Sequence, residues 1–87
     1  ERMVQLPLWD DYKEQLKSTC ADLKNICGRM AGTITAGKFL EHFAKAPFVH
    51  IDIAGPAFTE APENYKGNGG TGTGIRTLHE FFVNYKK

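Results

Sequence analysis

The sequence has few of the residues that hold small secreted domains together or that act as nucleophiles. It contains two cysteines, Cys20 and Cys27, too few for a disulfide framework. The six residues between them fit no zinc knuckle, so we expect two reduced thiols in a cytosolic protein. Ser18 is the only serine and lies in no Gly-x-Ser-x-Gly elbow. Either cysteine needs a positioned base to be a catalytic nucleophile, and no pattern in the sequence identifies one.

Strong net charge and long apolar runs are also missing. The 87 residues carry a formal net charge of +1, and their eleven lysines and arginines are scattered along the chain. This distribution offers no basic surface for nucleic acid. The longest apolar stretch is far too short to span a bilayer, so we expect no membrane partner. The length is enough for one small domain.

Hydrophobic spacing predicts two helices in the first half of the chain. Residues 3–6 are extended, and Asp11 and Glu14 have the spacing of a capping box at the start of a first helix. The apolar stripe of that helix is Tyr12, Leu16 and Cys20. A stronger helix opens at residues 34–36. Its apolar face consists of Ala36, Phe39, Leu40, Phe43 and Ala44, and its polar side of Lys38, Glu41 and Lys45.

One strand and a final helix are predicted in the second half. Residues 48–53 alternate Val49, Ile51 and Ile53 with more polar positions, as strands do. A loop rich in glycine and proline then runs to Gly74. The last helix carries Ile75, Leu78, Phe82 and Tyr85. The predicted class is therefore α/β, with helices flanking one or two strands. Because so small a sheet cannot cover these apolar faces, we expect the chain to be part of a larger fold.

The glycine-rich stretch from Gly67 to Gly74 raises the question of phosphate binding. Gly67, Gly69 and Gly72 have the G-x-G-x-x-G spacing. That fingerprint needs a strand leading directly into the glycines, whereas thirteen residues separate the predicted strand from Gly67. No Lys-Ser/Thr pair follows the last glycine, so the Walker pattern fails as well. We expect a loop, with Thr73 near the N-cap of the last helix.

The histidines do not complete a metal site in the sequence. His50 and Asp52 lie on one face of the predicted strand, where a His–Asp hydrogen bond is a simpler expectation than a metal site lacking further ligands. His79 and Glu80 begin an H-E-x-x-H pattern, but Val83 occupies its last position. We therefore expect His79 at the surface. From these residues alone the chain has no complete catalytic set.

Four ordered blocks nevertheless resemble the C-terminal end of the leucyl (cytosol) aminopeptidases. They read LPLWDDYKEQLKSTCADLKNI, AGTITAGKFLEHF, HIDIAGPAF and GTGIRTLHEFF, and cover nearly the whole chain. The resemblance implies that residues 1–87 are the C-terminal portion of a single mixed-sheet catalytic domain. The upstream metal-binding part and the N-terminal domain are then absent from these residues.

The resemblance also implies a chemistry and a setting. In that family two divalent ions, zinc or manganese, hold a water that attacks the peptide carbonyl. A lysine and an arginine-bound bicarbonate assist, and all these groups lie upstream of the matched segment. The implied parent is a cytoplasmic homo-hexamer that acts on peptides. No catalytic residue or metal ligand is then expected in this chain.

Three residues are implied to contact substrate. Ala54 and Ala57 match the family positions that line the pocket for the N-terminal side chain of the substrate. Ile26 matches a position lining the next subsite, although Cys27 stands beside it where glycine is usual. The glycine-rich stretch matches a family loop that leads from the pocket strand into the final helix.

Two main hypotheses follow. The first is a segment of a metal-dependent aminopeptidase that supplies pocket walls and core packing. The alternative is a non-catalytic fragment or interaction module that self-associates through its apolar helix faces. A nucleotide-binding module is a third hypothesis that rests only on the glycine spacing.

Overall fold

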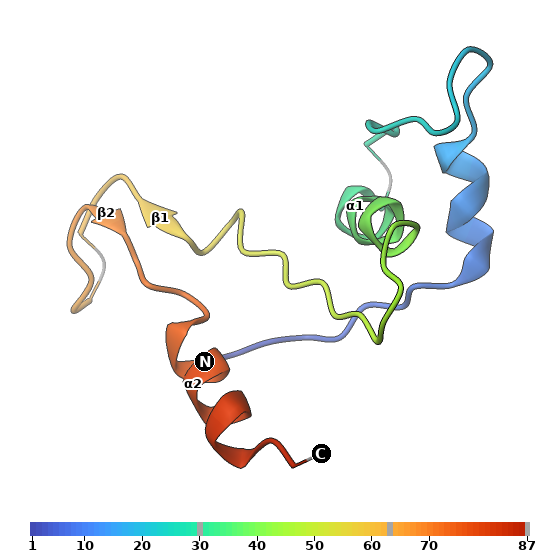
Figure 1. Ribbon diagram of the computed structural model, residues 1–87. Helices are drawn as coiled ribbons and strands as arrows, with labels where there is room; N and C mark the ends of the chain where they lie inside the picture. The colour runs from blue at the N-terminus through green and yellow to red at the C-terminus, as the bar shows by residue number, and fades with distance from the viewer. Residues whose placement is uncertain (30, 63, 87) are drawn as a thin grey trace. The chain divides into compact units, whose positions relative to one another are not determined.

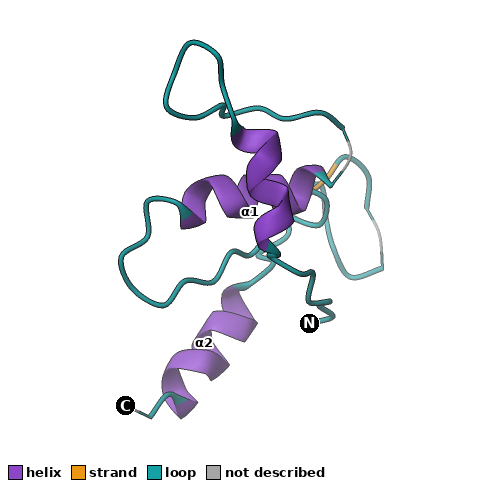
Figure 2. Ribbon diagram, turned by 90° about the vertical axis from the view of Figure 1, so that its right-hand side faces the viewer, coloured by secondary structure: helices purple, strands orange, loops and turns teal. Residues whose placement is uncertain are grey.

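The computed structural model describes residues 1–29, 31–62 and 64–86. Its elements are the 3-10 helix η1 (Asp10–Leu16), helix α1 (Gly32–Glu41), strands β1 (Phe58–Thr59) and β2 (Gly69–Gly70), and helix α2 (Ile75–Asn84) (Figure 1). The chain divides into two compact units. We call Val4–His50 the α1 unit, and Glu1–Met3 together with Ile51–Lys87 the α2 unit. Strand is a small share of the described chain (Figure 2), which is compatible with an α/β piece of a larger domain.

In the α1 unit, η1 packs against α1. Leu16, at the end of η1, is 3% exposed and is the one hydrophobic side chain in the described part of the chain that is buried. Tyr12 on the same stripe is half-buried, as expected. Cys20 is exposed, because η1 ends at Leu16 and the chain bends away before it reaches the third stripe position.

The predicted capping box at the start of the first helix is wrong. The helix begins at Asp10, and its N-cap is Trp9, which makes no side-chain cap bond. Asp11 therefore lies inside the first turn, where the attraction between an acidic side chain and the positive end of the helix dipole is still favourable. The helix is 3-10 rather than α, with i to i+3 bonds such as Tyr12 N–H to the Trp9 carbonyl at 3.2 Å.

Helix α1 lies where a helix was expected but buries a different face. Its buried residues are Thr35, Gly37 and Lys38, although Lys38 was predicted on the polar side. Of the predicted apolar face, Phe39 is half-buried and the remaining residues are exposed, namely Ala36, Leu40, Phe43 and Ala44. The reason is that η1 and the segment before it bring polar partners to the Lys38 side of the helix.

The predicted strand at residues 48–53 is not formed as a strand. None of its odd-numbered apolar residues is buried: Val49 is 80% exposed, Ile51 41% and Ile53 40%. A strand needs a hydrogen-bonded neighbour, and no segment of the described residues pairs with this one. At its start, the ring of His50 lies so close to Gly37 that a Cβ there would meet it at 3.3 Å.

In the α2 unit, the stretch expected to be a loop contains a short hairpin. Strands β1 and β2 are antiparallel and pair Phe58 with Gly70 and Thr59 with Gly69. The Thr59 hydroxyl donates to the Gly67 carbonyl at 2.6 Å, at the end of the hairpin next to its connecting loop. Helix α2 then begins at Ile75, as predicted, and none of its residues is buried.

Candidate functional site

The turn formed by residues 54–57 holds two of the three predicted substrate-contacting residues. The Ala57 N–H donates to the Ile53 carbonyl at 3.0 Å and closes the turn. The Ala54 N–H donates to the Asp52 carboxylate at 3.0 Å. Ala54 is exposed and Ala57 is half-buried. Small apolar side chains at an exposed turn are suited to form the wall of an apolar pocket.

The Gly/Thr loop, residues 67–74, is bonded directly to this turn. The Thr71 N–H donates to the Ala57 carbonyl at 2.9 Å. The hydroxyls of Thr71 and Thr73 lie 2.5 and 2.9 Å from the Pro56 carbonyl oxygen, and both are placed to donate to it. The glycine-rich stretch thus serves as a brace for the 54–57 turn. The glycine spacing did not predict this role. The feature of the sequence that could have indicated it is the alternation of threonine with glycine.

Gly72 permits this arrangement of the two threonines. Its φ is +70°, in the left-handed region that side chains with a Cβ rarely adopt. A Cβ at this position would also lie 3.3 Å from the Cδ1 atom of Ile75. Gly72 therefore reverses the backbone between Thr71 and Thr73, so that both hydroxyls reach the same carbonyl.

The helix after the loop is capped by a side chain from the start of the sequence. One carboxylate oxygen of Glu1 accepts the Gly74 N–H at 3.0 Å, and the other accepts the Thr77 N–H at 3.0 Å and its hydroxyl at 2.5 Å. These bonds, the Thr77 hydroxyl first, lower the pKa of Glu1 from 4.5 to about 2. Thr73 does precede the N-cap, Gly74, but its hydroxyl is turned to Pro56 instead of capping.

Ile26, the third predicted residue, lies in the α1 unit, separate from the unit that holds Ala54 and Ala57. It is 75% exposed and borders a hollow of about 200 Å³. The other residues around this hollow are Asn25, Cys27, Gly28, Gly32, Thr35 and Ala36. The Cys27 thiol donates to the Gln15 carbonyl at 3.1 Å, which ties this loop to η1.

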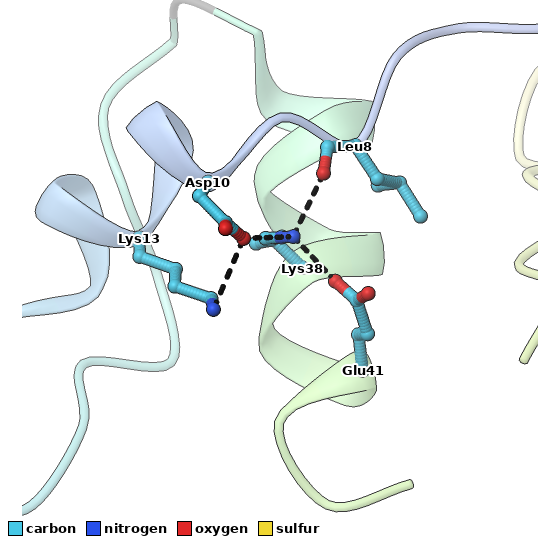
Figure 3. Close-up of polar contacts among 5 residues, drawn as sticks. All are labelled: Leu8, Asp10, Lys13, Lys38 and Glu41. Atoms are coloured by element: carbon cyan, nitrogen blue, oxygen red, sulfur yellow. Dashed lines mark hydrogen bonds and ion pairs between the residues drawn. The ribbon is translucent and has the colours of Figure 1, made fainter. Parts of the chain in front are cut away.

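Lys38 is the centre of a polar cluster that the sequence did not reveal. Its side chain is 2% exposed, and its Nζ lies 2.6 Å from Glu41 Oε2 and 3.2 Å from Asp10 Oδ1 (Figure 3). It also donates to the Leu8 carbonyl at 2.7 Å. The bond to Glu41 raises the pKa of Lys38, with a smaller contribution from Asp10, against the opposing effect of burial. A lysine held as a cation by these groups joins η1 to α1 and is unsuited to act as a nucleophile.

The described residues do not assemble a metal centre. Within 1–29, 31–62 and 64–86, no group of three or more His, Cys, Asp or Glu side chains could hold an ion. His79 is 70% exposed, as expected for a surface residue, and lies 3.7 Å from Glu80. The helices in this part of the chain are all too short or too polar to cross a membrane.

Comparison with known proteins identifies the family. Residues 1–79 match the model of the cytosol aminopeptidase family, catalytic domain. The chain belongs to the cytosol aminopeptidase family. A probable cytosol aminopeptidase of Clostridium perfringens is 53% identical over 81 residues, which are 92% of this chain and 16% of that protein. One of Alkaliphilus metalliredigens is 48% identical over 88 residues, covering all of this chain and 18% of that protein.

The cytosol aminopeptidase match confirms the family expected from the four blocks, and the family is one of peptidases. The matched range, residues 1–79, includes the 54–57 turn, Ile26 and the Gly/Thr loop. The chain spans only 16–18% of the length of these relatives. A further relative, from Gloeobacter violaceus, is 50% identical over 84 residues, or 17% of its length. The described residues therefore correspond to a small part of a cytosol aminopeptidase.

Proposed function

We propose that this chain works as part of an aminopeptidase that releases N-terminal residues from peptides, and that it walls the substrate pocket. In this proposal Ala54 and Ala57 face the N-terminal side chain of the peptide. The observation that carries it is the 54–57 turn, whose two small residues lie next to hydrogen bonds from Thr71 and Thr73 of the Gly/Thr loop. A rigid wall of methyl groups favours a Leu-like side chain over a charged one.

The remaining parts of the proposal come from family membership. Ile26 lines the neighbouring subsite, and residues outside this chain hold two divalent ions, zinc or manganese. When bound, such ions polarise the peptide carbonyl and activate water. The described residues do not fit such a centre, so we assign them no step of the hydrolysis. We also propose a cytosolic setting, no nucleic-acid partner and, as in the family, a hexameric assembly.

Enlarging the pocket wall tests this function. In the full-length enzyme that carries these residues, Ala57→Leu is expected to lower kcat/KM for leucine 4-nitroanilide by at least about tenfold, because the added side chain fills the space of the substrate. Activity on glycine 4-nitroanilide is expected to change by less than about twofold. Ala54→Leu is expected to act in the same direction.

Ala61→Leu is the matched control, because Ala61 is exposed in the same unit but outside the turn. If Ala57→Leu and Ala61→Leu have the same effect on both substrates, residues 54–57 do not form the pocket wall. If the wild-type protein hydrolyses no amino-acid anilide in the presence of manganese, the aminopeptidase proposal itself fails.

The second candidate is a non-catalytic, self-associating fragment. It is favoured by the exposure of large apolar side chains on α2, such as Ile75 at 67% and Phe82 at 69%. Intact mass separates the two candidates. A purified protein of several tens of kilodaltons with manganese-dependent activity supports the enzyme. An inactive protein near 9.7 kDa supports the fragment.

A further inference from the structure

Three oxygen atoms meet where the Gly/Thr loop contacts the 54–57 turn. The Pro56 carbonyl oxygen lies 2.5 Å from Thr71 Oγ1 and 2.9 Å from Thr73 Oγ1, and the two hydroxyl oxygens are 2.8 Å apart. Each hydroxyl has a single hydrogen to donate. The Thr71 hydroxyl, at the shorter distance, donates to the carbonyl. The Thr73 hydroxyl can then donate either to the same carbonyl or to the Thr71 oxygen.

The carbonyl in this cluster belongs to the peptide between the two proposed pocket residues. Pro56 directly precedes Ala57 and follows Ala54 by two positions, so the orientation of its carbonyl fixes the peptide plane that carries Ala57. Apart from the cluster, the turn is closed by the Ala57 to Ile53 backbone bond and the Ala54 to Asp52 bond. Neither of these bonds involves the Pro56 carbonyl.

The Thr71 backbone adds a second connection. Its N–H donates to the Ala57 carbonyl, so one residue is bonded to both peptide groups that flank Ala57. The Thr73 N–H lies 3.3 Å from Thr71 Oγ1 and orients that hydroxyl. The loop therefore controls the position of the Ala57 methyl group relative to the turn.

We infer that Thr71 and Thr73 are positioning residues that set the depth of the pocket at Ala54 and Ala57, and hence the selectivity for the N-terminal side chain. This inference rests on the proposed function. Neither hydroxyl needs to touch the substrate. Their contribution is to hold the 54–57 turn in one orientation, and so to fix the positions of the two methyl groups.

The test compares side-chain selectivity in variants of the full-length enzyme. Thr71→Val and Thr73→Val remove each hydroxyl with little change in shape, and Thr71→Ser and Thr73→Ser retain it. The readout is the ratio of kcat/KM for leucine 4-nitroanilide to that for alanine 4-nitroanilide. This ratio does not depend on how much of the protein is active, so partial misfolding of a variant does not change it.

We expect each valine variant to lower the leucine-to-alanine ratio by about threefold to tenfold, because a shifted wall affects the larger side chain more. We expect each serine variant to keep the ratio within about twofold of the wild-type value. Thr59→Val is the matched control, since it removes a hydroxyl bond to Gly67 in the same unit but away from the turn. Its ratio is expected to stay at the wild-type value.

Three results overturn the inference. An unchanged ratio in both valine variants shows that the hydroxyls do not set selectivity, while wild-type activity leaves the proposed function standing. An equal fall in the ratio for the valine and serine variants shows that the hydroxyls are not the cause. If the wild-type enzyme hydrolyses no anilide, the proposed function is wrong, and this inference is wrong with it.

Discussion

The Glu1 carboxylate accepts both the backbone N–H and the hydroxyl of Thr77, at 3.0 and 2.5 Å, although 76 positions separate the two residues. The contact lies within the α2 unit and anchors the start of the sequence to the first turn of α2. A carboxylate at this end of a helix satisfies N–H groups that have no partner inside the helix. Glu1 thus supplies the capping side chain, while Thr73 lies next to the N-cap, as expected, and its hydroxyl bonds to Pro56.

This contact predicts a pH dependence. Because the pKa of Glu1 in the folded chain is about 2, below its ordinary value of 4.5, the carboxylate stabilises α2 above pH 4.5. That contribution is lost progressively as the pH falls from 4.5 through about 2. Thr77→Val is expected to raise the pKa of Glu1, and Thr77→Ser to leave it near 2, as measured by NMR titration of the carboxyl carbon. An equal pKa in all three proteins would show that the Thr77 hydroxyl is not the main cause.

The Lys38 cluster predicts unequal effects of its two carboxylates. Glu41→Gln is expected to speed amide hydrogen exchange in α1 by about tenfold, because the buried Lys38 cation loses its shortest ionic partner. Asp10→Asn is expected to have a smaller effect, since Asp10 is 80% exposed and also pairs with Lys13. Lys38→Met serves as the control that removes the cation itself. Equal exchange rates in the Glu41 and Asp10 variants would contradict this ranking.

Because the pKa of Lys38 is raised, the stabilising effect of the same cluster is expected to be lost only at high pH. Stability from the charged amine is fully present below pH 10.5 and is lost as the pH rises through the higher folded-state pKa. Protection of the α1 amides is therefore expected to persist to pH 10.5 in the wild type. Earlier loss in the wild type than in Lys38→Met would show that the cluster does not stabilise the helix.

Gly72 predicts a backbone effect on the brace. Gly72→Ala is expected to destabilise the α2 unit by about 1–2 kcal/mol, the usual cost of placing a Cβ in the left-handed region. Gly67→Ala is the control, because that glycine does not have a positive φ and a Cβ there meets no atom within 4 Å. Hydrogen exchange at the Thr71 and Ala57 amides measures the difference. Equal protection in the two variants would mean that Gly72 is not held in this conformation.

The apolar surface of α2 predicts association when the 87-residue chain is purified alone. Phe82 is 69% exposed. Phe82→Lys is expected to weaken self-association by about tenfold, because the interface between copies then buries one aromatic side chain fewer. His79→Lys adds a lysine to the same helix without removing an apolar side chain. Sedimentation equilibrium provides the measurement. A wild-type chain that stays at 9.7 kDa at all concentrations would exclude the self-associating fragment.

Local patterns predicted where the helices begin, although η1 and α1 end before the predicted apolar stripes do. Helix α2 begins at Ile75, as its apolar spacing indicated, and α1 begins two residues before the predicted start. Helix positions follow from contacts between near neighbours in the sequence, so a short window contains the needed information. The predicted strand at residues 48–53 is wrong because strand formation depends on residues outside such a window. Its alternation describes a surface that fits a sheet, but the hydrogen-bonded neighbour has to come from elsewhere.

The ordered blocks of this sequence determined its family, and the match over residues 1–79 confirms it. The sequence by itself also shows that the lysines and arginines are scattered along the chain and that no long apolar run is present. Only the tertiary structure decided which side chains meet: Lys38 with Asp10, and the threonines of the Gly/Thr loop with Pro56. The physical reason is that a hydrogen bond or ion pair depends on a separation of about 3 Å in space. Sequence spacing reports that separation within one helix or turn but not between segments that the chain folds together.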